Sequence, residues 1–242
     1  MKNRTQDGAL TTFAAIFLPV LIAAFFGYAY ACVYGWWSIA AIAGIIAAFP
    51  LSSLLHELGH MLFGACVKIK CVPKFSILHS SSCKIVPKTD KNLKGRIIFT
   101  TLGGVSVNLI LAVLGIVAFF VPAVPLWLSA ILPASLYLFT LNVMPVTLSD
   151  GKTDGLVVLE LAKNEDTAKV MLAVLTVQAQ ILNGKPVEEI EESLLMDLPQ
   201  IQEDDINFIA LTQLRYEYFK AKGDEQSAEK YLKRFESLKE YL

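Results

Sequence analysis

The segment His56-Glu57-Leu58-Gly59-His60 brings together three side chains that metal-dependent hydrolases use. On a helix, His56 and His60 are four residues apart and share a face, so both imidazoles can reach one metal ion. Glu57 lies beside the first of them, where its carboxylate can take a proton from a water molecule that the metal activates. The spacing therefore predicts hydrolytic chemistry with His56 and His60 as metal ligands and Glu57 as the general base.

The residues before this motif are too apolar for the surface of a soluble enzyme. No charged residue occurs between Trp36 and Leu55. A charged side chain at the centre of a bilayer costs about 2.5–3.5 kcal/mol, so such residues are rare in apolar spans and usually functional. We therefore interpret the three side chains as a site built within a membrane.

Apolar helices are the elements that must position this site. Of the 242 residues, 55% are hydrophobic and 18% are charged, and the mean hydropathy is +0.53. This composition predicts an all-α polytopic membrane protein with about four transmembrane helices rather than a large soluble core. The four segments long enough to span a bilayer are Ala9–Val33, Trp36–Phe63, Ile97–Val121 and Leu126–Met144.

The loop Val67–Arg96 predicts how these spans are oriented. It carries eight lysine and arginine residues against one acidic residue, Asp90. Basic loops remain in the cytosol, so we expect this loop and both termini to be cytosolic and the site to lie near the cytosolic face. Short β-prone stretches in the loop predict a small sheet or re-entrant hairpin. These stretches are Lys68–Val72, Phe75–His79 and Ser82–Val86.

Charge divides the chain into two predicted domains, residues 1–155 and 156–242. The first carries 11 Lys and Arg against 5 Asp and Glu, and the second carries 10 against 17. The acidic part shows helical periodicity, with two leucine-to-glycine segments that each precede an acidic amphipathic stretch. Such helix pairs are similar to tetratricopeptide units and predict a soluble cytosolic domain that can bind a protein partner. The two pairs are Leu175–Gly184 with Val187–Met196, and Leu214–Gly223 with Gln226–Leu238.

A catalytic zinc ion usually has three protein ligands and one position for water, so a third ligand is expected outside the motif. The fourth apolar segment runs towards the cytosol and leads from Asn142 and Pro145 to Asp150-Gly151. A second aspartate-glycine pair begins at Asp154. The spacing from Pro145 favours Asp150 as the ligand, with Asp154 as the alternative.

The two motifs together resemble the site-2 protease family of intramembrane zinc metalloproteases. That family joins a His-Glu-x-x-His helix to a later Asn-x-x-Pro…Asp-Gly segment. The resemblance covers about residues 36–155. It implies that one zinc ion is held by His56, His60 and Asp150 and that Glu57 is the base. The expected activity is hydrolysis of a peptide bond in or near a transmembrane segment, for regulated intramembrane proteolysis or peptide-precursor processing.

The family also has a Gly-x-x-x-Asn element in an intervening helix, and Gly104 to Asn108 is similar, although Val105 replaces the usual proline. Asn108 and Asn142 either bind substrate or an oxyanion, or merely join helices by hydrogen bonds. The expected partners are a membrane-embedded protein or peptide substrate and the lipid bilayer of a bacterial cell membrane, and no nucleic acid. The alternatives are a non-proteolytic membrane protein that binds or transports metal, and a scaffold that recruits partners through its acidic tail.

Overall fold

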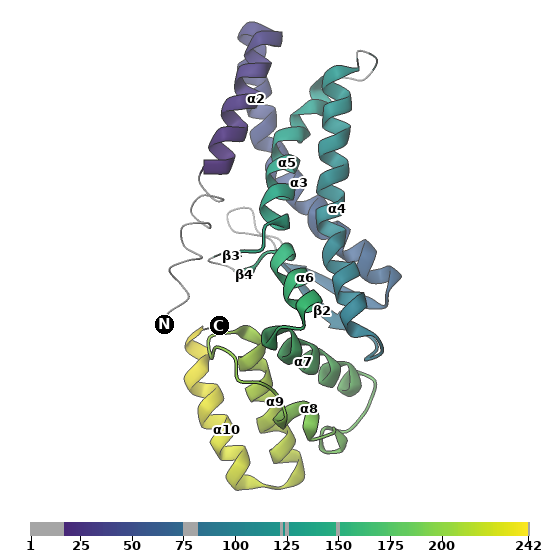
Figure 1. The fold of residues 1–242 in the computed structure, drawn as a ribbon, viewed down its shortest axis with the longest axis vertical. Helices are drawn as coiled ribbons and strands as arrows, with labels where there is room; N and C mark the ends of the chain where they lie inside the picture. The colour runs from purple at the N-terminus through teal and green to yellow at the C-terminus, as the bar shows by residue number, and fades with distance from the viewer. Residues whose placement is uncertain (1–16, 75–81, 122, 124–125, 149–150, 242) are drawn as a thin grey trace. The chain divides into compact units, whose positions relative to one another are not determined.

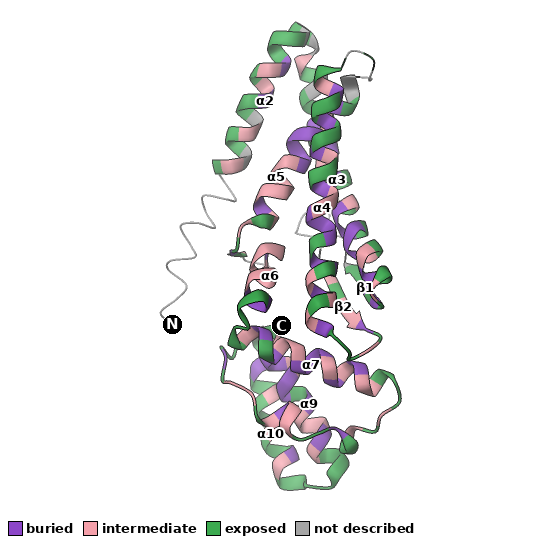
Figure 2. Cartoon of the chain, turned by 45° about the vertical axis from the view of Figure 1, so that its right-hand side comes forward, coloured by how far each residue is buried: buried purple, intermediate pink, exposed green. Residues whose placement is uncertain are grey.

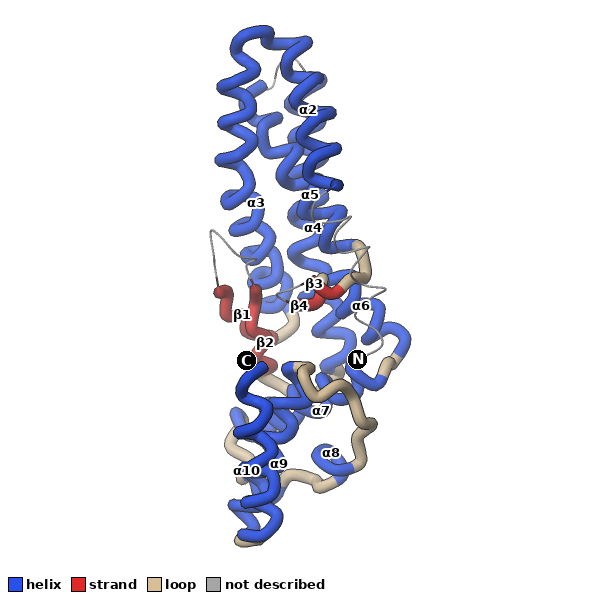
Figure 3. The backbone as a smooth tube through the Cα atoms, turned by 90° about the vertical axis from the view of Figure 1, so that its left-hand side faces the viewer, coloured by secondary structure: helices blue, strands red, loops and turns tan. Residues whose placement is uncertain are grey.

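The computed structural model describes residues 17–74, 82–121, 123, 126–148 and 151–241, and most of them are helical (Figures 1 and 3). The chain separates into two compact units. Their limits differ from the predicted domains, because parts of the basic loop belong to the unit that contains the C-terminal segment. The first unit comprises Met1–Cys66, Cys71–Lys84 and Phe99–Leu159, and the second comprises Val67–Lys70, Ile85–Ile98 and Glu160–Leu242.

Hydrogen bonds within the second unit give the reason for this difference. Arg96 Nη1 donates to the backbone carbonyl of Val67 at 2.8 Å, and Lys94 Nζ donates to Asn164 Oδ1 at 2.7 Å. The side-chain amide of Asn183 donates to the backbone carbonyl of Lys88 at 3.2 Å. The basic side chains and backbone of the loop therefore pair with the C-terminal segment, a partnership that charge counting along the chain does not reveal.

Apolar helices correspond to the four predicted apolar segments, and two of them are long and apolar enough to cross a membrane. These two membrane-length stretches are Ile42–Cys66 and Leu93–Phe120, whereas Val20–Val33 and Leu128–Val143 are shorter. Residues 9–16 of the first predicted segment lie outside the described residues. The helices are α2 (Leu18–Tyr34), α3 (Ser38–Cys66), α4 (Leu93–Phe120) and α5 (Ile131–Val143), with 3-10 turns η2 (Gly35–Trp37) and η3 (Leu126–Ala130).

The long apolar helices expose much of their surface, as the colouring of α3 and α4 shows (Figure 2). In the most apolar windows of α3 and α4, only 33% and 39% of the residues are buried. Ile46, Leu62 and Ile110 are among their exposed side chains. Helices in the core of a soluble protein are mostly buried, so an exposed apolar surface of this kind is what contact with lipid requires.

Glycines let α3 and α4 approach closely beside the histidine motif. A Cβ atom added at Gly59 would lie 2.6 Å from the carbonyl oxygen of Gly103, and one added at Gly103 would lie 2.5 Å from that of Gly59. Small residues at helix crossings allow such close backbone packing in membranes. The crossing brings the backbone of α4 to the face of α3 that carries the two histidines.

Two short sheets accompany the helices. Strand β1 (Ile69–Lys74) pairs with β2 (Ser82–Pro87), which confirms the small sheet predicted from Lys68–Val72 and Ser82–Val86. The third predicted stretch, Phe75–His79, lies outside the described residues. A second, unpredicted ladder joins β3 (Thr147–Leu148) to β4 (Gly151–Lys152) in antiparallel register, with Thr147 opposite Lys152 and Leu148 opposite Gly151.

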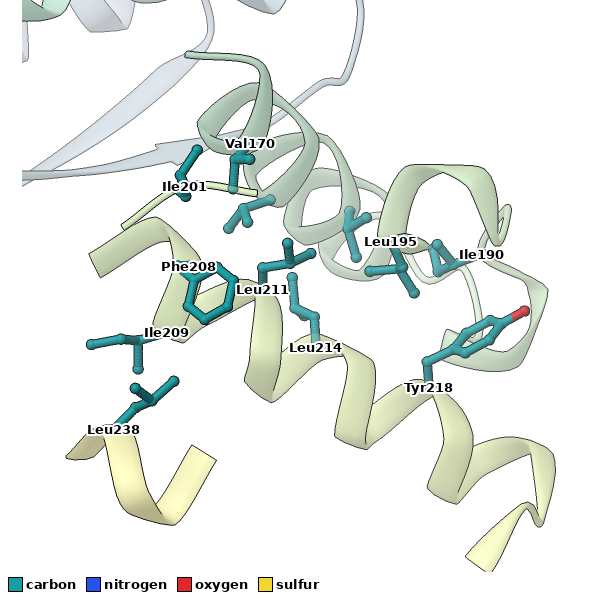
Figure 4. Packing of buried hydrophobic residues seen from close by; sticks show 12 residues of the cluster. Val170, Ile190, Leu195, Ile201, Phe208, Ile209, Leu211, Leu214, Tyr218 and Leu238 are labelled. Carbon is teal, nitrogen blue, oxygen red and sulfur yellow. The ribbon is translucent and has the colours of Figure 1, made fainter. Parts of the chain in front are cut away.

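The C-terminal segment is helical and packs around its own apolar core (Figure 4). One predicted helix pair is present, because α9 ends at Gly223 in a left-handed conformation (φ 76°) and α10 follows with Asp224 as its N-cap. The other pair is incomplete, since Val187–Met196 forms short turns after Pro186 rather than one amphipathic helix. The elements are α6 (Asp154–Lys163), α7 (Asp166–Leu182), η4 (Val187–Glu189), α8 (Ser193–Met196), α9 (Ile206–Lys222), α10 (Glu225–Leu238) and η5 (Lys239–Tyr241).

Candidate metal centre

The three residues of the motif lie on α3 as the spacing predicts, and all three are buried. Their relative exposures are 7% for His56, 4% for Glu57 and 7% for His60. The Nε2 atoms of the two histidines are 3.1 Å apart, so both rings point to one place. One turn of helix therefore delivers two metal-ligating nitrogens to a single point inside the protein.

Asp154, the first residue of α6, completes a three-residue group. Its Oδ2 atom lies 3.2 Å from Nε2 of His56 and 3.4 Å from Nε2 of His60. In the described part of the chain, His56, His60 and Asp154 form the group of ligand atoms that can hold a metal ion. Asp150, which the motif spacing favoured, lies outside the described residues, so the alternative aspartate is the one placed beside the histidines.

The β3–β4 ladder explains how Asp154 reaches this position. The amide of Thr153 donates to the carbonyl of Val146 at 3.1 Å, and the amide of Val146 donates to Thr153 Oγ1 at 3.2 Å. Thr153 Oγ1 also donates to the carbonyl of Met144. The chain thus leaves Val146, forms the ladder and returns to the same point before Asp154 begins α6. Counting residues from Pro145 does not reveal this return.

The distances within the group fit a tetrahedral zinc site. Ligand atoms about 2.0–2.1 Å from a zinc ion in tetrahedral geometry lie roughly 3.3–3.4 Å from one another. The three observed separations of 3.1, 3.2 and 3.4 Å are close to this value. Two imidazole nitrogens and one carboxylate oxygen are also a donor set that zinc accepts in catalytic sites.

The protonation of these groups also suits a cation. His60 Nδ1 lies 3.0 Å from the carbonyl oxygen of Thr100 and 3.3 Å from the backbone nitrogen of Gly104, and a proton on Nδ1 donated to Thr100 would leave a lone pair on Nε2 for a metal. Burial acts to raise the pKa of Asp154, but the adjacent His56 and His60 hold that pKa below its usual value, which favours the carboxylate. A metal cation at this point would stabilise the same carboxylate charge that the two histidines stabilise here.

Gly104 on α4 provides the space beside the two histidines. A Cβ atom at this position would lie 2.5 Å from Nε2 of His60 and 2.6 Å from Nε2 of His56. These are the nitrogen atoms that would bind the metal. A side chain at this position would therefore occupy the space in front of both Nε2 atoms.

We expect Gly104→Ala to abolish stoichiometric metal binding while the protein stays folded. The added methyl group must displace the imidazoles from their common point, because it has no other space. Gly44→Ala is the matched control, since a Cβ at Gly44 meets only Ala130 Cβ at 3.5 Å, an ordinary contact. Metal analysis of the two purified variants tests this, and normal metal content in Gly104→Ala would contradict the geometry.

Glu57 is buried beside the ligand group without being part of it. Its Oε2 atom is buried and has no hydrogen-bond partner in the described part of the structure. Glu57 adjoins His56 in the sequence, and it is not part of the three-residue ligand group. A buried carboxylate oxygen without a partner beside such a group is available to accept a proton from a reactant.

The two asparagines occupy different surroundings. Asn108 is fully buried, and its Nδ2 atom lies 2.9 Å from His56 Nδ1. Asn142 is partly buried, and its side-chain amide donates to the carbonyl of Leu138 within α5 at 2.9 Å.

A Cβ atom added at Gly155 would collide with the carbonyl oxygen of Val143, so this glycine lets the start of α6 pack against the end of α5.

Sequence reasoning missed the polar residues that support the ligands. Ser52 precedes His56 by one helical turn, a spacing that could have drawn attention to it. The contribution of Thr100 comes from its backbone carbonyl, which no side-chain motif can signal.

No family model, no curated protein and no solved structure matches this chain. The functional inference therefore rests on the residues of the site.

Proposed function

We propose that the protein is an intramembrane zinc metalloprotease that hydrolyses a peptide bond in or near a transmembrane segment. The observation that carries the proposal is the convergence of His56, His60 and Asp154 within 3.4 Å of one another beside a buried Glu57. The sequence resemblance to site-2 proteases supports the same activity, with Asp154 rather than Asp150 as the third ligand.

The chemistry assigned to each side chain follows from its position. His56, His60 and Asp154 would hold the ion, which when bound polarises a peptide carbonyl and lowers the pKa of a water molecule. Glu57 takes the proton of the attacking water and returns it to the leaving amine. A substrate helix must unwind locally before attack, because its carbonyls are hidden in i→i−4 hydrogen bonds.

The proposed setting is a cell membrane. Exposed apolar side chains on α3 and α4 support contact with lipid, and the basic loop supports a cytosolic location for the end of α3 that carries the site. We propose that α2 and α5 cross the membrane with them, which gives four spans and two cytosolic termini. The acidic C-terminal segment would then be cytosolic and available to a protein partner.

A buried general base separates this proposal from a metal-transporting or scaffolding role. A transport site must release its ion and gains nothing from a carboxylate that is adjacent to the ligand group but outside it. A scaffold needs neither the ligand group nor the base. The unpaired buried oxygen of Glu57, outside the ligand group, supports a role in proton transfer at the site.

The proposal predicts that chelation abolishes proteolysis and that zinc restores it. The full chain is purified in detergent, its zinc content is measured, and it is incubated with a library of single-span membrane peptides. New peptide termini are identified by mass spectrometry before chelation, after chelation and after zinc is returned. Cleavage that follows zinc occupancy supports the proposal. A chain without stoichiometric zinc, or a zinc-loaded chain that leaves the whole library intact, would overturn it.

A further inference from the structure

A chain of fully buried polar side chains leads away from the metal group through three helices. His56 Nδ1 lies 2.9 Å from Nδ2 of Asn108, whose Oδ1 lies 3.4 Å from Ser52 Oγ. Ser52 Oγ in turn lies 2.8 Å from Ser135 Oγ. Asn108, Ser52 and Ser135 each have a relative exposure of 0%. The sequence motifs include only His56 and Asn108 of these four residues.

The three supporting residues come from different helices. Ser52 lies on α3 one turn before His56, Asn108 lies on α4, and Ser135 lies on α5. Buried polar groups must be hydrogen-bonded, and each of these has its partner within the chain. Among the described residues, these three side chains reach the metal group through the contact between Asn108 and His56.

The direction of that contact decides whether His56 can bind a metal. A neutral imidazole that binds through Nε2 carries its proton on Nδ1, so Nδ1 must donate a hydrogen bond to an acceptor. The side-chain oxygen of Asn108 is that acceptor when the amide is turned so that oxygen and nitrogen exchange places. In the opposite orientation the amide donates to Nδ1, which leaves the proton on Nε2 and blocks the metal.

The two serines accept the productive orientation without loss of a hydrogen bond, because each hydroxyl can both donate and accept. With its oxygen towards His56, Asn108 presents its NH₂ group to Ser52 Oγ, which accepts. Ser52 then donates its own hydroxyl proton to Ser135 Oγ, so every polar group in the chain is satisfied in one consistent direction. The serines therefore act on the metal ligand through the amide and do not touch the metal group themselves.

We propose that Asn108 is a positioning residue, held in place through Ser52 and Ser135, that holds the proton on Nδ1 of His56 and leaves Nε2 free for zinc. This inference rests on the proposed zinc site. It assigns the amide of Asn108 to His56 rather than to a substrate oxyanion. The fully buried amide has no exposed surface with which to contact a substrate.

The other histidine provides an internal comparison. Nδ1 of His60 faces two backbone groups, the carbonyl of Thr100 at 3.0 Å and the amide of Gly104 at 3.3 Å, and side-chain substitution leaves both in place. The proton on Nδ1 of His56 is held by a side chain. Of the two ligands, His56 is therefore the one whose tautomer a substitution can change without touching the ligand.

The test measures zinc affinity of the detergent-solubilised full chain by competition with a chromogenic chelator. We expect Asn108→Leu, which removes the acceptor, to weaken zinc binding about 10- to 100-fold. Asn108→Asp keeps an acceptor for Nδ1 and should bind zinc within about threefold of the wild type. Ser52→Ala should weaken binding less than Asn108→Leu and more than Ser135→Ala, because each step is further from the ligand.

Thr140→Val is the matched control on α5. Its hydroxyl donates only to carbonyls of its own helix, at Leu136 and Tyr137, so its removal should leave zinc affinity unchanged. Circular dichroism of each variant establishes that it is folded. If Asn108→Leu does not fold, Ser52→Ala decides the matter, with a measurable loss of affinity expected.

Wild-type affinity in folded Asn108→Leu or, failing that, in Ser52→Ala would overturn the inference. Equal losses in Asn108→Leu and Asn108→Asp would also overturn it, because packing rather than an acceptor would then be what matters. These outcomes differ from failure of the proposed function. A wild-type chain that binds no zinc, or binds zinc without proteolysis, defeats the protease proposal. If the chain binds zinc without proteolysis, the zinc affinities of the Asn108 and Ser52 variants still decide whether Asn108 positions His56.

Discussion

Glu57→Gln is expected to bind zinc as tightly as the wild type and to lose proteolysis by about 10²- to 10⁴-fold, the usual contribution of a general base. Glutamine has the size and shape of glutamate but cannot accept the proton of the attacking water. The side chain lies outside the ligand group, so the metal should remain. Zinc analysis and the peptide-cleavage assay on the same preparation measure the two effects separately.

Glu160→Gln is the matched control, because Glu160 is also buried at 8% exposure but has no place in the site. It should retain both zinc and cleavage. Loss of zinc in Glu57→Gln would indicate that Glu57 is a ligand rather than a base. Unchanged cleavage with normal zinc would remove Glu57 from the mechanism. The inactive, zinc-loaded variant is also the form best suited to retain an uncut substrate for identification.

Asp154→Ala is expected to weaken zinc binding by more than about 100-fold, beyond the 10- to 100-fold loss typical of residues that support ligands indirectly. The substitution removes one of three protein ligands and leaves two neutral imidazoles, which hold a divalent cation poorly. Proteolysis should fall with it. The loss should appear in equilibrium competition with a chelator and in the zinc content after gel filtration.

The comparison with Asp150→Ala makes this result decisive. Both variants remove an aspartate that precedes a glycine in the same ten-residue segment, so they differ mainly in which carboxylate is lost. We expect Asp150→Ala to retain zinc. The reverse pattern, with zinc lost only in Asp150→Ala, would favour the spacing-based assignment and contradict the contacts of Asp154 with His56 and His60.

Much of the architecture was predictable because apolar runs and helix periodicity are local properties. The segment Trp36–Phe63 predicts α3 closely, although the helix starts at Ser38 and extends to Cys66. The apolar run Leu126–Met144 predicts one span, but its first five residues form the 3-10 turn η3 and α5 is correspondingly short. The basic loop was the least predictable part, since its hydrogen-bond partners are distant in the sequence.

The candidate site also contains residues that local spacing predicts and residues that only the fold brings together. His56, Glu57 and His60 lie within one turn and a half of helix, so their spacing alone places them together. Asp154 depends on the path of the chain after α5, which a residue count describes poorly. Ser52 and Ser135 depend on how α3 packs against α5, and serine in an apolar helix carries no distinctive signal by itself.

The β3–β4 ladder has a consequence for how sites of this kind are found in sequences. Its ends are tied together where Val146 and Thr153 exchange hydrogen bonds, so residues can be gained or lost between them without moving Asp154. If Asp154 is the ligand, as we propose, a search pattern with a fixed gap after Pro145 would select Asp150 instead, whereas one that requires the closed hairpin would select Asp154.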